Sequence, residues 1–214
     1  MKKLMICLFI VPSVAFSQKT VTKATDNFTY KKTAERNLKI YSFKPPTWEK
    51  TKQYPSIVFY FGGALIKRNL NQLENIAQEF SENGYVAFLV DYRVKSRENV
   101  TTLDCISDAR DAFAFVRKNA DTFALDDSKI TAFGYSSGGY LASALGTLDD
   151  PIHGANSKPN SMILLAMGNP TKYRTPRWLG TSDLSPISPV DNINKETPAA
   201  LIFIGDKDLS LIHI

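Results

Sequence analysis

One short segment combines residue types that could carry out nucleophilic chemistry. Gly134-Tyr135-Ser136-Ser137-Gly138 follows an apolar run and leads directly into a stretch with helical spacing. A serine on a sharp strand-to-helix turn has a strained backbone, so the positions two before and two after it must lack bulk. Gly134 and Gly138 meet this need, and we expect the Ser136 hydroxyl to stand above the following helix. The alternative is a glycine-rich turn that allows close packing or cradles a phosphate, although the chain has neither G-x-G-x-x-G nor a P-loop lysine.

A second small-residue turn, Gly62-Gly63-Ala64, follows the apolar run SIVFYF. Acyl transfer creates a tetrahedral oxyanion that must be met by preorganised N–H donors, and small residues let the main chain approach the substrate closely. We expect Gly62, Gly63 and Ala64 to form this oxyanion loop. The N–H groups of Gly63, Ala64 and Ser137 are the candidate donors. A plain turn that uses two glycines is the alternative.

An acidic pair, Asp206 and Asp208, lies at the end of the last apolar run, AALIFI. A catalytic triad needs a carboxylate that holds a histidine in the right tautomer, and the chain order Ser, acid, His is the one used by α/β-hydrolases. Asp208 is the first candidate for this acid and Asp206 the second. Two aspartates in a solvated turn are the alternative.

The chain holds only two histidines, and neither is placed to act as the general base. His153 precedes the candidate acid, and we expect it on the surface. His213 follows Asp208 by only five residues, which is too short a reach. Residues 209–214, LSLIHI, are what CTG TCT CTT ATA CAC ATC encodes, the transposon end of a common sequencing-library adapter. We therefore expect genuine protein sequence to stop at Asp208 and the catalytic histidine to lie beyond it.

The elements that must position these residues alternate along the chain. Apolar runs of about six residues alternate with amphipathic stretches, which is typical of an α/β fold with a mostly parallel sheet and helices on both faces. Two further strands near the start should form an antiparallel edge. We expect residues 169–196 to form a loop or cap over the sheet. Within this segment, Tyr173 and Trp178 either line a substrate cleft or pack structurally. The expected strands are 27–32, 38–45, 56–61, 85–90, 129–135, 161–167 and 199–205, and the expected helices 71–84, 102–120 and 137–148.

Composition limits the class of protein. The 214 residues, 43% of them hydrophobic, fit one α/β domain and exclude a disordered or fibrous chain. The 26 basic and 21 acidic residues give a net charge of +5. Because the basic residues are scattered, the charge does not favour a nucleic-acid partner.

The first residues, MKKLMICLFIVPSVAFSQ, have the pattern of a secretory signal: two lysines, an apolar stretch and a small-residue ending. Cleavage after Ser17 would leave residues 18–208 as the domain, in a secreted or periplasmic protein with no membrane anchor. It would also leave Cys105 as the sole cysteine, packed as a small hydrophobe without a disulfide.

From about Asn37 to Asp208 the chain resembles the secreted α/β-hydrolase fold esterases of the acetyl esterase and hormone-sensitive-lipase-like group. The resemblance implies Ser136 as nucleophile and Asp208 as acid, with Gly62, Gly63 and Ala64 as oxyanion loop. It implies a small-molecule or carbohydrate ester as substrate, and no metal or organic cofactor. The motifs that carry it are IVFYFGGA, DYRVKSR, CISDARDAFAFVRKNA, KITAFGYSSGGYLA and SPISPV.

The chain departs from this family in two respects. Many members have His-Gly-Gly-Gly where this chain has Phe61-Gly62-Gly63-Ala64, and an alanine at the last position costs little if its φ is negative. The last strand and helix of the fold are expected to be missing, so the 214-residue chain should be inactive. Residues 91–97 match, and we interpret Asp91 to Arg93 as structural support for the oxyanion loop.

Two other functions remain open at this point. A serine peptidase of the prolyl-oligopeptidase type shares the fold and triad, but the signal placed directly before this domain argues against it. A non-catalytic binding protein with a hydrolase-like fold would suit the missing histidine.

Overall fold

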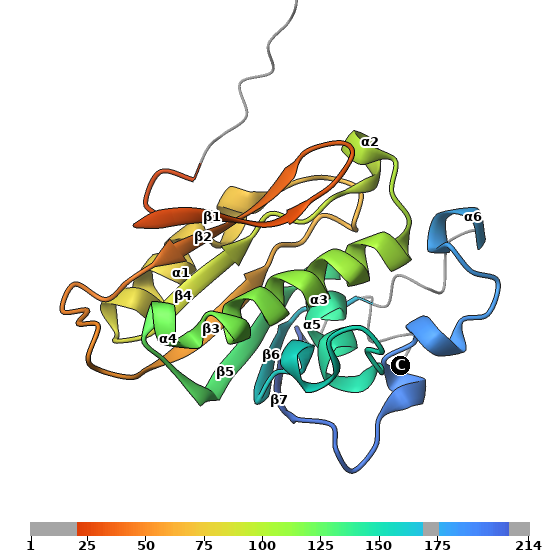
Figure 1. Ribbon diagram of the computed structural model, residues 1–214. Coiled ribbons are helices and arrows are strands. Elements are labelled where there is room, and N and C mark those ends of the chain that lie inside the picture. Colours follow the sequence, from red (N-terminus) through yellow and green to blue (C-terminus); the bar gives the residue numbers. More distant parts are fainter. Residues whose placement is uncertain (1–20, 169–175, 206–214) are drawn as a thin grey trace, which may run out of the picture.

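The computed structural model describes residues 21–168 and 176–205, which build one seven-stranded sheet (Figure 1). The strand order is β1-β2-β4-β3-β5-β6-β7, with β4, β3, β5, β6 and β7 parallel and the β1–β2 pair antiparallel at one end. This confirms the predicted α/β class and the antiparallel edge. The strands are β1 Asp26–Lys32, β2 Asn37–Phe43, β3 Tyr54–Tyr60, β4 Val86–Val90, β5 Leu125–Tyr135, β6 Ser161–Leu165 and β7 Ala199–Phe203.

Helices cover both faces of the sheet, as the continuous apolar strands predict. Successive side chains of a strand point to opposite faces. Thus Phe59 of β3 packs edge-on against Phe80 of α1 (Glu74–Glu82), with ring centroids 5.7 Å apart. The next residue, Tyr60, donates a hydrogen bond to the Ala109 carbonyl of α3 (Thr102–Lys118) at 3.0 Å. In Figure 1, α3 and α5 (Ser137–Thr147) lie together on the face opposite α1.

The three predicted helices form because their sequences supply ends as well as apolar faces. Helix α3 begins at a capping box in which Thr101 and Asp104 satisfy each other's backbone N–H groups. Cys105, a buried free cysteine, packs on its inner face as predicted. The shorter helices are α2 Lys95–Glu98, α4 Ala120–Phe123 and α6 Pro176–Leu179, and the 3₁₀ turns are η1 Leu70–Leu73, η2 Gly154–Ser157, η3 Ser185–Ile187 and η4 Val190–Asn192.

Strand β7 forms the other end of the sheet and is largely uncovered. Leu201, Ile202 and Phe203 are 50–54% exposed, although each is a large apolar residue. On the α1 face an apolar groove of about 310 Å³ runs from Ile57 across Ile163 to Leu201. The core is therefore dense under the first five strands and thin at β7.

Residues 176–205 cross from the carboxyl edge of the sheet back to β7 with only short turns of helix, in agreement with the predicted loop or cap. The segment is anchored, because the Tyr140 hydroxyl of α5 donates to the buried Ile187 carbonyl at 2.6 Å. Tyr173 lies outside the described residues. Among the helices of residues 21–168 and 176–205, none has the length and apolar character needed to cross a membrane.

Candidate active site

Ser136 occupies the sharp turn between β5 and α5 that its flanking glycines predict. Its backbone angles are φ +53° and ψ −119°, a conformation that is unfavourable for a residue with a side chain. A methyl group on Gly134 would lie 2.1 Å from the Gly138 carbonyl oxygen. The Ser136 N–H donates to the Leu165 carbonyl of β6 at 2.8 Å, which holds the strained turn in place.

The oxyanion loop lies beside this turn because β3 and β5 are neighbouring parallel strands. Tyr60, the last residue of β3, is in register with Gly134. A methyl group on Gly138 would fall 2.0 Å from the Tyr60 carbonyl oxygen, and one on Gly62 only 3.1 Å from the Ser136 Cβ. The small residues at all three positions thus bring the two loops into van der Waals contact at the carboxyl edge of the sheet.

The loop itself contains three successive residues with positive φ. The angles are +143° at Gly63, +57° at Ala64 and +57° at Leu65. The condition of a negative φ at Ala64 is not met, because the chain makes a tight turn in which the Gly63 carbonyl accepts the N–H groups of Ile66 and Lys67. Alanine and leucine hold left-handed angles only where surrounding contacts impose them.

Two side chains that the sequence analysis did not single out provide such contacts. Gln72 in the η1 turn accepts the Gly62 N–H on its Oε1 at 3.0 Å. The Ser137 hydroxyl oxygen accepts the Leu65 N–H at 3.2 Å, in buried surroundings. The Gly62 N–H is therefore engaged within the chain. Ala64 is exposed and Ser136 is half-buried. In the sequence, Gln72 lies within the stretch 71–84 that is predicted to be an amphipathic helix, and nothing in this pattern indicates a contact with Gly62.

Phe61, which replaces the family's histidine, anchors the loop by stacking. Its ring lies parallel to that of Tyr92, with centroids 4.1 Å apart and an interplanar angle of 9°. The Tyr92 hydroxyl also donates to the Phe61 carbonyl at 2.6 Å, and both residues are fully buried. An aromatic contact and a hydrogen bond to the Phe61 carbonyl thus hold the loop.

The residues on either side of Tyr92 are held by buried charges. Asp91 accepts two hydrogen bonds from Arg68, at 2.8 and 2.9 Å, and also pairs with Arg36 at 3.2 Å. Arg93 donates to both oxygens of the fully buried Asp108, at 2.8 and 2.9 Å. Hydrogen bonding to Asp108 holds the pKa of the Arg93 guanidinium well above its ordinary value. Through its two hydrogen bonds to Asp91, Arg68 links the segment that follows the oxyanion loop to the end of β4.

The candidate acid and base are placed only in part. Asp206, Asp208 and His213 lie outside the described residues, although β7 brings the chain to the same carboxyl edge before them. His153 follows the far end of α5, a helix of about 16 Å by its length. Its Nε2 lies 2.7 Å from Asp111 Oδ1 on α3, and its side chain is only 14% exposed. The His153 ring is thus partly buried, because it pairs with Asp111, while its neighbours Ile152 and Gly154 are exposed.

Comparison with known proteins gives the family. The model of the BD-FAE family matches residues 38–166, which are more than half of the chain. This chain belongs to the BD-FAE family. The chain is also similar to solved structures of esterase 2 from Thermogutta terrifontis. These similarities confirm the α/β-hydrolase fold that the sequence resemblance implies.

The similarity to the esterase 2 structures covers most of this chain and a smaller share of those structures. The esterase 2 structure phosphoramylated by tabun is 32% identical, with a TM-score of 0.81, over 88% of this chain and 73% of that one. The propionate-bound structure is 31% identical, with a TM-score of 0.76, over 85% and 71%. An AB hydrolase superfamily protein of Schizosaccharomyces pombe is 29% identical over 104 residues, 48% of this chain and 30% of the yeast protein. The chain thus spans less than a third of that curated relative.

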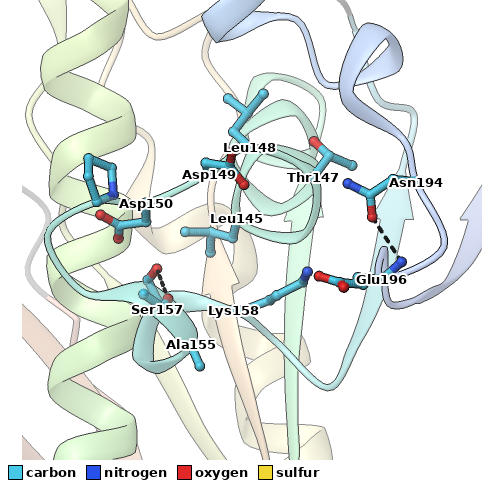
Figure 2. A pocket seen from close by; sticks show the side chains of 12 residues that line it. Leu145, Thr147, Leu148, Asp149, Asp150, Ala155, Ser157, Lys158, Asn194 and Glu196 are labelled. Atoms are coloured by element: carbon cyan, nitrogen blue, oxygen red, sulfur yellow. Dashed lines mark hydrogen bonds between the residues drawn. The ribbon is translucent and has the colours of Figure 1, made fainter.

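Besides the apolar groove near β7, the structure has a pocket that lies away from Ser136, at the opposite end of α5. It encloses about 410 Å³ between the end of that helix, the loop before β6 and the turn before β7. Figure 2 shows Lys158 and Glu196 reaching across it from these two loops. Since Ser136 and the oxyanion loop lie at the carboxyl edge, this pocket is not part of the candidate active site.

Two further observations bear on what the site could hold. Trp178 of α6 lies under the Lys95 ammonium, which is 4.4 Å from the ring centroid, so the indole has a structural contact besides any role at a cleft. Within the described ranges 21–168 and 176–205, no three His, Cys, Asp or Glu side chains are grouped as metal ligands.

Proposed function

We propose that the complete protein is a serine carboxylic-ester hydrolase that acts on short acyl esters. The observation that carries the proposal is the strained Ser136 at the β5–α5 turn, in contact with the oxyanion loop through Gly62. A hydroxyl raised on such a turn, next to backbone N–H groups and the N-terminus of a helix, has the surroundings that acyl transfer needs. Membership of the BD-FAE family supports the same reaction class.

The proposed reaction runs through an acyl-enzyme. The Ser136 Oγ bonds to the ester carbonyl carbon while its proton passes to a histidine, and the carbonyl electron pair moves onto oxygen. The N–H groups of Gly63, Ala64 and Ser137 stabilise that oxyanion. The tetrahedral adduct collapses and expels the alcohol, which takes the proton from the histidine. Water then cleaves the acyl-enzyme by the same steps in reverse order, and Asp208 orients the histidine throughout.

The ligands named for one set of related structures support short acyl groups. Esterase 2 of Thermogutta terrifontis is described with propionate bound and with butyrate bound, and it is phosphonylated by cyclosarin and by sarin. We propose acetyl groups on plant or dietary carbohydrates as the natural substrates of the present protein. Acetylated xylan and p-nitrophenyl acetate are therefore the substrates to compare.

We further propose that the general base lies beyond Asp208. The one described histidine, His153, pairs with Asp111 and lies past the far end of α5. The uncovered apolar side chains of β7 support the view that more of the domain follows. Reading the genomic DNA across the Asp208 codon tests this: we expect the frame to continue into a further strand and a loop with a histidine. A stop codon after Ile214 would contradict it.

Export is proposed from residues 1–17. We expect the mature protein to begin at Gln18, in the periplasm or outside the cell. Sequencing the N-terminus of the protein recovered from its native host tests this, and a retained Met1 would contradict it.

The decisive experiment measures p-nitrophenyl acetate hydrolysis by the full-length protein and by Ser136→Ala. We expect the substitution to abolish turnover and also labelling by a fluorophosphonate probe. Ser128→Ala is the matched control, because Ser128 is an exposed serine near the start of the same strand. A full-length protein that hydrolyses no ester and is not labelled at Ser136 would overturn the proposal in favour of a binding role, and cleavage of peptides alone would favour a peptidase.

A further inference from the structure

The residue after the nucleophile touches the oxyanion loop with its side chain as well as following Ser136 in the chain. Its hydroxyl oxygen accepts the Leu65 N–H at 3.2 Å, and Ser137 is only 4% exposed. Because Ser137 is covalently next to Ser136, this one hydrogen bond links the backbone of the nucleophile turn to the backbone of the loop.

Leu65 needs this contact because of its conformation. It is fully buried with φ +57°, and it follows Ala64, which has the same positive φ. Leucine in a left-handed conformation is strained unless surrounding contacts fix it. Its N–H is held by Ser137 and its carbonyl by the Lys95 N–H at 2.9 Å. Of these two contacts, only the one with Ser137 comes from the nucleophile side.

We infer that the Ser137 hydroxyl is a positioning residue for the oxyanion hole. It fixes Leu65, and thereby the adjacent Ala64 and Gly63 N–H groups, at a set distance from Ser136. The inference rests on the proposed function. It deepens that function by assigning the side chain of Ser137 a role separate from that of its N–H group, which would itself contact the oxyanion.

The inference predicts a specific kinetic defect. Replacing Ser137 by alanine keeps the backbone N–H but leaves the buried Leu65 N–H without its acceptor, so the loop can shift. A displacement of about 1 Å at a catalytic site lowers turnover roughly 100-fold, and loss of a whole oxyanion donor lowers it by about 100- to 1,000-fold. We therefore expect kcat of Ser137→Ala to fall about 10- to 100-fold, while KM stays within about threefold because the acyl and alcohol contacts are untouched.

A matched control is available on the same helix. Ser143 of α5 is also 4% exposed, and its hydroxyl donates to the Tyr140 carbonyl at 2.8 Å. Ser143→Ala thus removes a buried serine hydrogen bond without touching the loop. We expect its kcat to stay within about twofold of the unmodified protein, because the substitution affects stability alone.

The test uses the full-length protein and three readouts: kcat, KM and the inhibition constant of a trifluoromethyl ketone. The Ser136 hydroxyl adds to the carbonyl of such a ketone, and the resulting hemiketal carries an oxyanion. We expect Ser137→Ala to weaken this inhibitor by the same factor as it lowers kcat/KM. If kcat of Ser137→Ala falls no further than that of Ser143→Ala, or if kcat falls while the inhibitor binds unchanged, the inference is wrong. Should Ser137→Ala not fold, Ser137→Cys, with a weaker acceptor of similar shape, is judged by the same criteria. Absence of Ser136-dependent turnover in the unmodified protein would instead contradict the proposed function.

Discussion

The Gly134 Cα and the Gly138 carbonyl approach each other across the nucleophile turn so closely that a methyl group on Gly134 would lie 2.1 Å from the oxygen. Both partners in this contact are backbone atoms, so no side-chain rotation can relieve it. Strand β5 and helix α5 are therefore separated by a distance that only glycine permits.

Gly134→Ala is expected to destabilise the protein by about 3 kcal/mol or more, since overpacked cores lose about 1 to 3 kcal/mol even where side chains can adjust. Thermal unfolding followed by circular dichroism measures the loss. Gly168→Ala is the control, because a methyl group there would have no neighbour within 4 Å among the described residues. Equal unfolding midpoints for the two variants would show that the turn is looser than described.

Ala64→Gly is expected to leave the protein as stable as before or up to about 1.5 kcal/mol more stable. Relief of a left-handed conformation gains about 1 to 2 kcal/mol, and the added freedom of glycine in the unfolded chain costs about 0.5 to 1 kcal/mol. Ala144→Gly, in the buried interior of α5, should destabilise by at least about 1 kcal/mol. Urea unfolding distinguishes the two, and a clear loss of stability in Ala64→Gly would contradict the positive φ.

Asp108→Ala is expected to destabilise the protein by about 3 to 5 kcal/mol, because it leaves the buried Arg93 guanidinium and the Lys31 ammonium without their shared carboxylate. Lys52→Ala is the control: it breaks an ion pair with Glu49 in which both side chains are more than half exposed. Urea unfolding should show no measurable change for this control. A similarly small change for Asp108→Ala would mean that the buried cluster does not stabilise the fold.

The capping box of α3 should make stability depend on pH. Burial raises the pKa of Asp104, but hydrogen bonds from the Thr101 side chain and backbone and the charge of Arg93 outweigh it, so the pKa lies below its ordinary value. A carboxyl with a lowered folded-state pKa stabilises the protein above its unfolded pKa and loses this contribution as pH falls through the folded value. Asp104→Asn should therefore be less stable than the unmodified protein at pH 6, by up to about 1 kcal/mol.

The difference should shrink once the pH falls below about 4, the ordinary pKa of aspartate. Unfolding free energies at pH 6, 4 and 2.5 measure this. A stability gap between the two proteins that is constant over this range would contradict the assigned role of the carboxylate.

The sequence predicts the parts of this fold that depend on local patterns. All seven strands and the three long helices were expected within a few residues of where they lie, because buried strands and amphipathic helices differ in the period of their apolar residues. The Ser136 turn was predicted from neighbouring residue types, because glycines flank the serine on both sides. The order of the strands, with β4 between β2 and β3, is not written in any local pattern.

The contacts that complete the candidate site are of the non-local kind. Gln72 meets Gly62 through a 3₁₀ turn that reads in the sequence as part of a helix, and Ser137 meets Leu65 across 72 positions of the chain. The positive φ of Ala64 follows from hydrogen bonds within the turn. The sequence does not indicate it, because the residue at that position is alanine and not glycine. Residue type therefore singles out the candidate catalytic groups, while the contacts that hold them are found only in the three-dimensional structure.

The uncovered strand β7 has a practical consequence for work with the isolated polypeptide. An exposed apolar strand at the end of a sheet can serve as a template on which another chain adds a strand. We expect the 214-residue chain, produced alone, to form oligomers or inclusion bodies at high concentration through edge-to-edge association. Placing a lysine at Leu201 or Phe203 is a direct way to keep such preparations dispersed. Biophysical work on the isolated domain would therefore begin from that variant.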